Sequence, residues 1–352
     1  MSIAAQKTEQ QNELTVKDEQ YERPQTPSLW YGVALAGLVG LMAFLLGKQF
    51  PTVGGPVFAI LLGLVIRNIF GVSSIFKPGL QFSSKSILQW SIIFLGFGLS
   101  FGQVVTTGID SIVVTIGTII AAFVSAFLLG KVLGVQDKIR SLIGIGTAIC
   151  GGSAIAALAP IIKPKDHETA LAVSTIFLFN VVAVLTFPFF GHLFQMSDMG
   201  FGLWAGTAIN DTSSVVAAAY SFSNSAGDYA TIVKLTRATF IIPICIFYVV
   251  WQLIQQKKSS EKINIQRLIP WFIIYFVCAS LIRSSDILPA DVLLFLSYCA
   301  HFLMVLALAA IGLSTDMRML VRTGWQPLAL GLGTWAAVVT TSLAIQLVMG
   351  KW

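Results

Sequence analysis

The stretch SIVVTIGTIIAAFVSAFLLG, residues 111–130, is twenty residues long and contains no charged side chain. A helix of about 20 apolar residues crosses a hydrocarbon core roughly 30 Å thick. Apolar blocks of this length recur along the chain, which predicts a protein that crosses a bilayer many times. None of them shows the alternating pattern of membrane β-barrel strands. The predicted fold class is therefore all-α and polytopic.

The overall composition supports this prediction. The 352 residues are 56% hydrophobic and 11% charged, whereas soluble domains carry about 25% charged residues. Such a chain has too few charged side chains to cover a globular surface in water. The four Cys lie in apolar blocks and the three His are scattered, so the spacing of metal ligands is absent. We expect no metal site and no cofactor.

The chain divides into a tail and one membrane domain. Residues 1–28 are polar and lack the apolar core of a signal peptide, which predicts a disordered cytoplasmic tail. Residues 29–352 are predicted to form a single transmembrane domain of about eleven spans. The apolar blocks leave no room for a soluble domain, and they lie near 29–47, 52–70, 86–104, 111–130, 141–161, 168–194, 200–221, 228–254, 268–284, 290–313 and 324–349.

Orientation follows from the Lys and Arg residues of the loops. With eleven spans, fifteen of them fall on the side of the N-terminus and five on the other side. The positive-inside rule then predicts a plasma-membrane protein with a cytoplasmic N-terminus and an external C-terminus. Lys163 and Lys165 fall on the less basic side, which indicates that the fifth span is re-entrant or unusually broken. Anionic lipid accounts for the net charge of +6, so no nucleic-acid partner is expected.

Glycines and hydroxyls crowd the middle of the fifth span, in residues 144–153. Glycine costs up to about 1 kcal/mol relative to alanine within a helix, and unwound backbone at membrane depth occurs where it lines a cavity or is buried in protein. We predict a helix interrupted between Gly146 and Ser153, whose half-helix ends bind substrate; close helix packing is the alternative. The candidate substrate-binding residues are Gly146, Thr147, Cys150, Gly151, Gly152 and Ser153.

A second polar segment interrupts the span 200–221. An acidic group inside a membrane is expensive and marks a functional site, although a position at the end of the span is the alternative. We expect these side chains to face the protein interior near the break in the fifth span. The candidates are Asn210, Asp211, Thr212, Ser213 and Ser214. Both segments contain Gly-Thr-Ala-Ile, but their 60-residue offset spans two predicted helices, which would leave both copies in one orientation.

Two cations follow in the next span. Lys234 and Arg237 are three residues apart and therefore share a helix face. Buried cations need a partner, and Asp211 can neutralise one of them. We expect Lys234 and Arg237 to reach the same cavity as Asp211 and to make it cationic; snorkelling to the membrane surface is the alternative.

At these residues the chain resembles the YeiH family of proposed sulfate exporters. The resemblance covers nearly all of the chain after residue 28. It implies membership of the superfamily of sodium/bile-acid symporters and sodium/proton antiporters, with inverted repeats, discontinuous crossing helices and a core domain that moves against a panel domain. The matching stretches are residues 146–153, 206–214, 234–237 and 310–316.

The function that we expect is ion-coupled secondary transport, in the direction of export, of a small anion such as sulfate or another sulfur oxyanion. Na+ or H+ is the expected coupling ion, and the expected partners are this solute and the lipid bilayer, with a homodimer left open. The chain has no GxxxxGK[ST] loop to bind ATP. A cation/proton antiporter with Asp211 as carrier and Lys234 as counter-ion is the main alternative. An intramembrane enzyme with Ser153 or Cys150 as nucleophile is disfavoured, because neither His nor Asp lies in that segment.

Overall fold

The computed structural model describes residues 29–50, 54–255, 271–317 and 324–352, with the side chains of 252–255 left aside. Every regular element in these ranges is a helix, and six of the described helices are long and apolar enough to cross a membrane. The predicted all-α, polytopic fold is therefore confirmed. The predicted tail, residues 1–28, lies outside the described residues.

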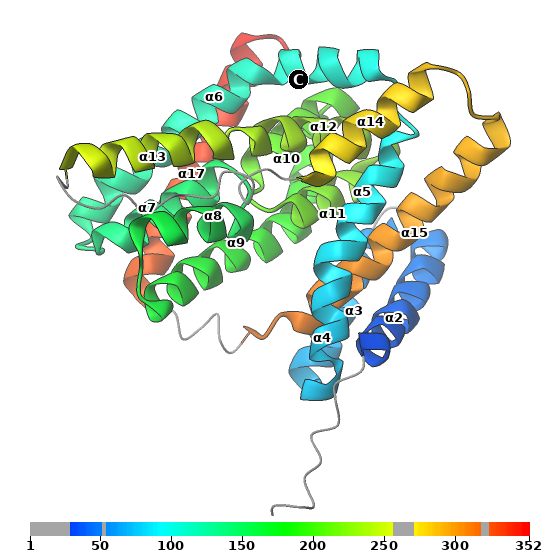
Figure 1. Cartoon of the computed structure of the whole chain (residues 1–352), viewed down its shortest axis with the longest axis horizontal. Coiled ribbons are helices and arrows are strands. Elements are labelled where there is room, and N and C mark those ends of the chain that lie inside the picture. The colour runs from blue at the N-terminus through cyan, green and yellow to red at the C-terminus, as the bar shows by residue number, and fades with distance from the viewer. Residues whose placement is uncertain (1–28, 51–53, 256–270, 318–323) are drawn as a thin grey trace, which may run out of the picture.

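Two groups of helices build the molecule (Figure 1). The first, which we call the α15 bundle, has one shared apolar core. A π-helical turn, η2, lies between α4 and α5. The bundle consists of α2 (Leu29–Gln49), α3 (Gly54–Ile69), η1 (Ser74–Phe76), α4 (Lys77–Phe82), η2 (Ser83–Ile87), α5 (Leu88–Gly96), α14 (Trp271–Ser284) and α15 (Ala290–Ser314).

Glycine allows a close contact between α3 and α15 in this bundle. A Cβ atom at Gly63 of α3 would lie 2.6 Å from the Ala309 carbonyl oxygen of α15, and one at Gly312 would lie 2.4 Å from the Ile60 carbonyl oxygen. Helices in membranes pack through small residues, because lipid supplies no hydrophobic force between them. The two glycines thus let α3 and α15 pack backbone to backbone.

The second group, which we call the hairpin bundle, has its own apolar core. It contains the two interrupted segments. Its helices are α6 (Phe101–Val132), α7 (Asp137–Ala148), α8 (Gly152–Ile162), α9 (Asp166–Leu193), α10 (Asp198–Ala208), α11 (Thr212–Phe222), α12 (Asn224–Thr239), α13 (Ile241–Gln255) and α17 (Trp325–Val348).

Both interrupted segments are re-entrant hairpins. Lys138, at the start of α7, donates from Nζ to the Lys163 carbonyl oxygen after the end of α8, at 2.7 Å. Phe201, at the start of α10, stacks on Phe222, at the end of α11, with ring centroids 4.1 Å apart. Neither contact could form if the two half-helices continued in one direction, since residues rise 1.5 Å each along a helix. Each segment therefore returns to the face where it began, instead of crossing as predicted.

This reversal removes the anomaly in the charge distribution. If α7 and α8 begin and end at one face, Lys163 and Lys165 join the basic face that holds Lys138 and Arg140. The re-entrant form of the fifth span, one of the two alternatives that its charges left open, is the one that the structure has.

The reversal also explains the repeated Gly-Thr-Ala-Ile sequence. Residues 146–149 end α7 and residues 206–209 end α10, and Ser153 and Ser213 are each the second residue of the following half-helix. Because each hairpin returns to its own face and is followed by one crossing helix, α9 or α12, the two units have opposite orientations. The 60-residue offset therefore marks an inverted repeat. The family resemblance implied such repeats, whereas the count of two helices between the copies argued against one here.

Candidate functional site

The tips of the two hairpins meet inside the hairpin bundle. The first tip breaks at Ile149–Gly151, where Gly151 adopts φ 63°, and the second breaks at Ile209–Asp211. A Cβ atom on Gly151 would lie 3.4 Å from the Asp211 Cβ atom. The interruption predicted between Gly146 and Ser153 is thus confirmed, and Asn210, Ser213 and Ser214 are buried beside it.

Lys234 joins the two tips. Its Nζ donates to the Ile149 carbonyl oxygen of the first tip and to the Ile209 carbonyl oxygen of the second, at 2.8 Å each. Ile149 and Ile209 are equivalent positions of the repeat. The fully buried ammonium group thus lies between the two units and contacts both in the same way.

Arg237 binds the same hairpins one turn further along α12. Its Nη2 donates to the Thr147 carbonyl oxygen at 2.8 Å, and its Nη1 to that of Thr207, the equivalent residue of the repeat. Its Nε donates to the Ala148 carbonyl oxygen at 2.6 Å. The last carbonyls of a helix lack partners within it and carry partial negative charge. Arg237 and Lys234 therefore satisfy and neutralise the C-terminal ends of α7 and α10.

This arrangement differs from the one expected from the sequence. Lys234 and Arg237 are buried, as predicted, but they do not line the cavity that Asp211 lines. They contact the C-terminal ends of α7 and α10, whereas the cavity is lined by the N-terminal ends of α8 and α11. Their charges act on backbone carbonyls, and the anion-binding role predicted for them stays a prediction.

The N-terminal ends of the other half-helices, α8 and α11, reach the cavity. Asp211 caps α11, where its Oδ2 accepts from the Ser213 backbone N–H at 3.0 Å and from the Ser213 hydroxyl. Gly151 occupies the equivalent cap of α8 and supplies no side-chain acceptor. The first N–H groups of α8 therefore lack the carboxylate that α11 carries.

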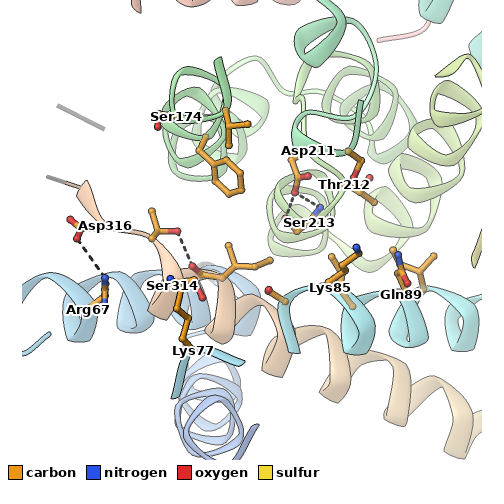
Figure 2. Close-up of a pocket in the computed structure, with 18 of the residues that line it drawn as sticks. Arg67, Lys77, Lys85, Gln89, Ser174, Asp211, Thr212, Ser213, Ser314 and Asp316 are labelled. Atoms are coloured by element: carbon orange, nitrogen blue, oxygen red, sulfur yellow. Dashed lines mark hydrogen bonds and ion pairs between the residues drawn. The ribbon is translucent and has the colours of Figure 1, made fainter. Parts of the chain in front are cut away.

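A cavity of about 470 Å³ lies between these hairpin tips and the α15 bundle. Figure 2 shows Lys85 and Gln89 across the cavity from Asp211, Thr212 and Ser213. Lys85 comes from the π-helical turn η2, a distortion often found at functional sites. The polar side chains of the lining are Arg67, Lys77, Ser84, Lys85, Gln89, Ser153, Ser174, Asp211, Thr212, Ser213, Ser314, Thr315 and Asp316.

The charges of this lining are not equally available to a ligand. Arg67 lies 3.6 Å from Asp316, and its neighbour Asn68 holds the end of α15 by donating to the Thr315 carbonyl oxygen at 3.2 Å. Asp211 is engaged with Ser213. Neither Lys77 nor Lys85 forms a salt bridge with any residue in the described ranges. With the cations Arg67, Lys77 and Lys85 against the carboxylates Asp211 and Asp316, the lining has an excess of positive charge.

The structure divides the predicted site residues into two groups. Ser153, Asp211, Thr212 and Ser213 line the cavity. The others build the tips or lie behind them, and they are Gly146, Thr147, Cys150, Gly151, Gly152, Asn210, Ser214, Lys234 and Arg237.

Sequence reasoning missed the half of the cavity that belongs to the α15 bundle. Arg67, Lys77 and Lys85 were considered only as loop cations that set orientation. Asp316 lay within a stretch that carries the family resemblance but was not chosen as a site residue. The available signal was the polar run Ser83–Lys85 directly before the predicted span 86–104.

Comparisons with known proteins show which family the chain resembles. A family model described as "Conserved hypothetical protein 698" matches residues 31–331. A membrane protein of Clostridium tetani is 40% identical over 91% of this chain and 97% of its own length. One from Fusobacterium nucleatum is 41% identical over 91% and 98%, and one from Streptococcus pyogenes is 43% identical over 91% and 97%. All three carry the name UPF0324 membrane protein.

This chain belongs to the UPF0324 family. The names of these UPF0324 relatives describe membrane proteins and state no activity. The family therefore establishes the membrane as the location of the chain, in agreement with its apolar helices. What UPF0324 proteins do has to be argued from the cavity.

Proposed function

We propose that this protein is a secondary transporter of a small anion, which binds in the cavity between the hairpin tips and Lys85. The observation that carries the proposal is the convergence of two helix N-termini, α8 and α11, on a cavity whose open charges are Lys77 and Lys85. Helix N-termini bind anions through free N–H groups and a partial positive charge. Cations on the facing wall add a charge-assisted contact.

Transport, rather than binding alone, is supported by the inverted repeat. Discontinuous helices from two oppositely oriented units, meeting near mid-depth, are typical of the substrate sites of secondary transporters. Here Lys234 joins the two tips from behind, so that the tips are able to move as one body against the α15 bundle. The cavity lies at the boundary between these two bodies.

The size and charge of the cavity favour a compact oxyanion. A volume of about 470 Å³ is near the lower end of the range for ligand sites. Hydroxyls of Ser153, Thr212 and Ser213 are donors suited to sulfate and related sulfur oxyanions. We propose export from the cytoplasm, coupled to Na+ or H+ through Asp211, with the N-terminus inside and the C-terminus outside.

Lys85→Gln tests the cavity directly. We expect sulfate, sulfite, thiosulfate or taurine to bind the purified full-length protein and raise its unfolding temperature. Losing a hydrogen bond to a charged group costs about 1.5–3 kcal/mol, so Lys85→Gln should weaken affinity by about tenfold or more in isothermal titration calorimetry.

The matched control is Lys131→Gln, which removes a cation near the end of α6 that does not line the cavity. It should leave affinity unchanged. Equal affinities for Lys85→Gln and the parent would contradict the proposed site. If no anion binds, but Na+ stabilises the parent and not Asp211→Asn, the cation/proton antiporter becomes the better reading.

A further inference from the structure

A second cluster of titratable side chains lies outside the cavity. The Tyr220 hydroxyl of α11 donates to Oδ1 of Asp228 in α12 at 2.5 Å. The Tyr220 ring meets the His301 ring of α15 edge to face, with centroids 5.2 Å apart. His301 Nδ1 lies 2.8 Å from the Ser297 carbonyl oxygen. Because a carbonyl only accepts, Nδ1 carries a proton, and Nε2 carries the lone pair of the neutral ring.

This cluster joins the two bundles on the side away from the cavity. Tyr220 and Asp228 belong to the hairpin bundle, whereas His301 belongs to the α15 bundle. The cavity meets α15 at residues 311 and 314–316, and His301 lies ten residues earlier, which is about 15 Å along a helix. Ser221, next to Tyr220, packs against Gly54 at the start of α3. The cluster thus bridges the bundles at a distance from the cavity.

Four charged or titratable groups on the packed elements have other partners. Lys234 of α12 contacts the hairpin tips, and Arg67 of α3 pairs with Asp316 at the opposite end. His192 of α9 stacks on Phe222, 4.3 Å away, and Lys48 of α2 lies over the Phe44 ring. Tyr220 contacts both Asp228 and His301 and so links the carboxylate to the imidazole ring.

We propose that Tyr220, Asp228 and His301 form a proton-binding latch that holds the two bundles together on the side away from the cavity. The inference rests on the proposed function, since it assigns the proton to a transport cycle in which this side opens. With one proton shared between Asp228 and His301, the cluster is neutral overall. Releasing that proton to water leaves a carboxylate in a mostly apolar interface, which is costly. Deprotonation thus favours separation of the bundles and hydration of Asp228.

A cysteine at Ser221 reports this opening. The full-length protein carries Ser221→Cys, and its four native cysteines, Cys150, Cys245, Cys278 and Cys299, are replaced by alanine. In proteoliposomes it is labelled with a membrane-impermeant maleimide. The rate of labelling of a free thiol in solution corrects for the pH dependence of the maleimide reaction itself. In this parent, labelling should rise several-fold as pH increases. Asp228→Asn removes the charge and should give slow, pH-independent labelling.

Two further variants give opposite shifts. His301→Gln removes one of the two proton acceptors, so the midpoint of the labelling curve should move to lower pH. Tyr220→Phe keeps the ring against His301 but removes the hydroxyl that stabilises the charged carboxylate, so the midpoint should move to higher pH. His192→Gln is the matched control, and it should leave the curve unchanged.

Labelling of Asp228→Asn with the pH dependence of the parent would overturn the latch, as would shifts of His301→Gln and Tyr220→Phe in the same direction. The same measurements test the latch and the proposed anion site independently of each other. A protein that binds anions at the cavity but shows pH-independent labelling lacks the latch alone. Labelling that follows pH in a protein that binds no anion would support the latch and refute the anion site.

Discussion

Arg237→Met is expected to abolish the accumulation of folded protein. The guanidinium donates to three carbonyl oxygens, those of Thr147, Ala148 and Thr207, and is fully buried. Each acceptor left unsatisfied in the interior costs about 1–3 kcal/mol, and three such losses rival a typical total stability of about 5–15 kcal/mol. The two hairpins would also lose the charge that balances their C-terminal ends.

Fluorescence-detected size-exclusion chromatography, followed by thermal unfolding, measures this effect. The matched control is Arg283→Met, which removes an arginine paired with Asp286 at the surface and should behave like the parent. Arg237→Lys keeps the charge with fewer donors, so we expect an intermediate yield. If Arg237→Met is monodisperse, unfolds like the parent and fails only to bind anions, Arg237 is a ligand of the anion and the capping role is wrong.

Gly151→Ala is expected to lower both stability and anion affinity. Gly151 adopts φ 63° and ψ −126°, a conformation that residues with a Cβ atom rarely adopt. Holding alanine there costs about 1–3 kcal/mol, and relaxation of the strain would move the N-terminus of α8 away from Asp211. Because Ser153 and Asp211 line the same cavity, the shift should weaken binding as well.

Gly152→Ala is the matched control one residue later. It has no positive φ, and the nearest atom to an added Cβ lies 3.8 Å away, so its unfolding temperature and sulfate affinity should remain near those of the parent. Unfolding temperatures measured by nano-scanning fluorimetry, with and without sulfate, separate the two effects. Equal behaviour of Gly151→Ala and Gly152→Ala would show that the tip tolerates a side chain and that its geometry does not set the site.

The sequence was sufficient for the fold class and for the position of the breaks. Apolar blocks of membrane length and the glycines of residues 144–153 both have direct energetic consequences. It was not sufficient for the path after each break. A segment of about 20 residues has the same composition whether it continues or reverses at its middle, and the direction depends on backbone angles such as those of Gly151. Only Lys163 and Lys165, on the wrong side of an eleven-span arrangement, indicated the reversal.

For a similar reason, only part of the candidate site could be predicted from the sequence. Burial of Lys234 and Arg237 followed from their position in an apolar span, but a buried cation can neutralise either a ligand or the carbonyl end of a helix. The spacing of the two residues is the same in both cases. On the facing wall, Arg67, Lys77 and Lys85 lie near the ends of spans, where the positive-inside rule already explains a cation. Only the folded arrangement shows that these residues share a cavity.

The inverted repeat bears on the number of ligands that can bind at the two hairpin tips. At the positions sixty residues before Lys234 and Arg237, α9 carries Ser174 and Phe177, and both line the cavity. The two repeat units therefore have similar backbones, but their crossing helices differ in charge: α12 carries two cations where α9 carries none. Lys234 and Arg237 contact one side of the joined tips, whereas Ser174 and Phe177 line the cavity on the other side. This departure from symmetry leaves one ligand site, and not two, to the transporter that we propose.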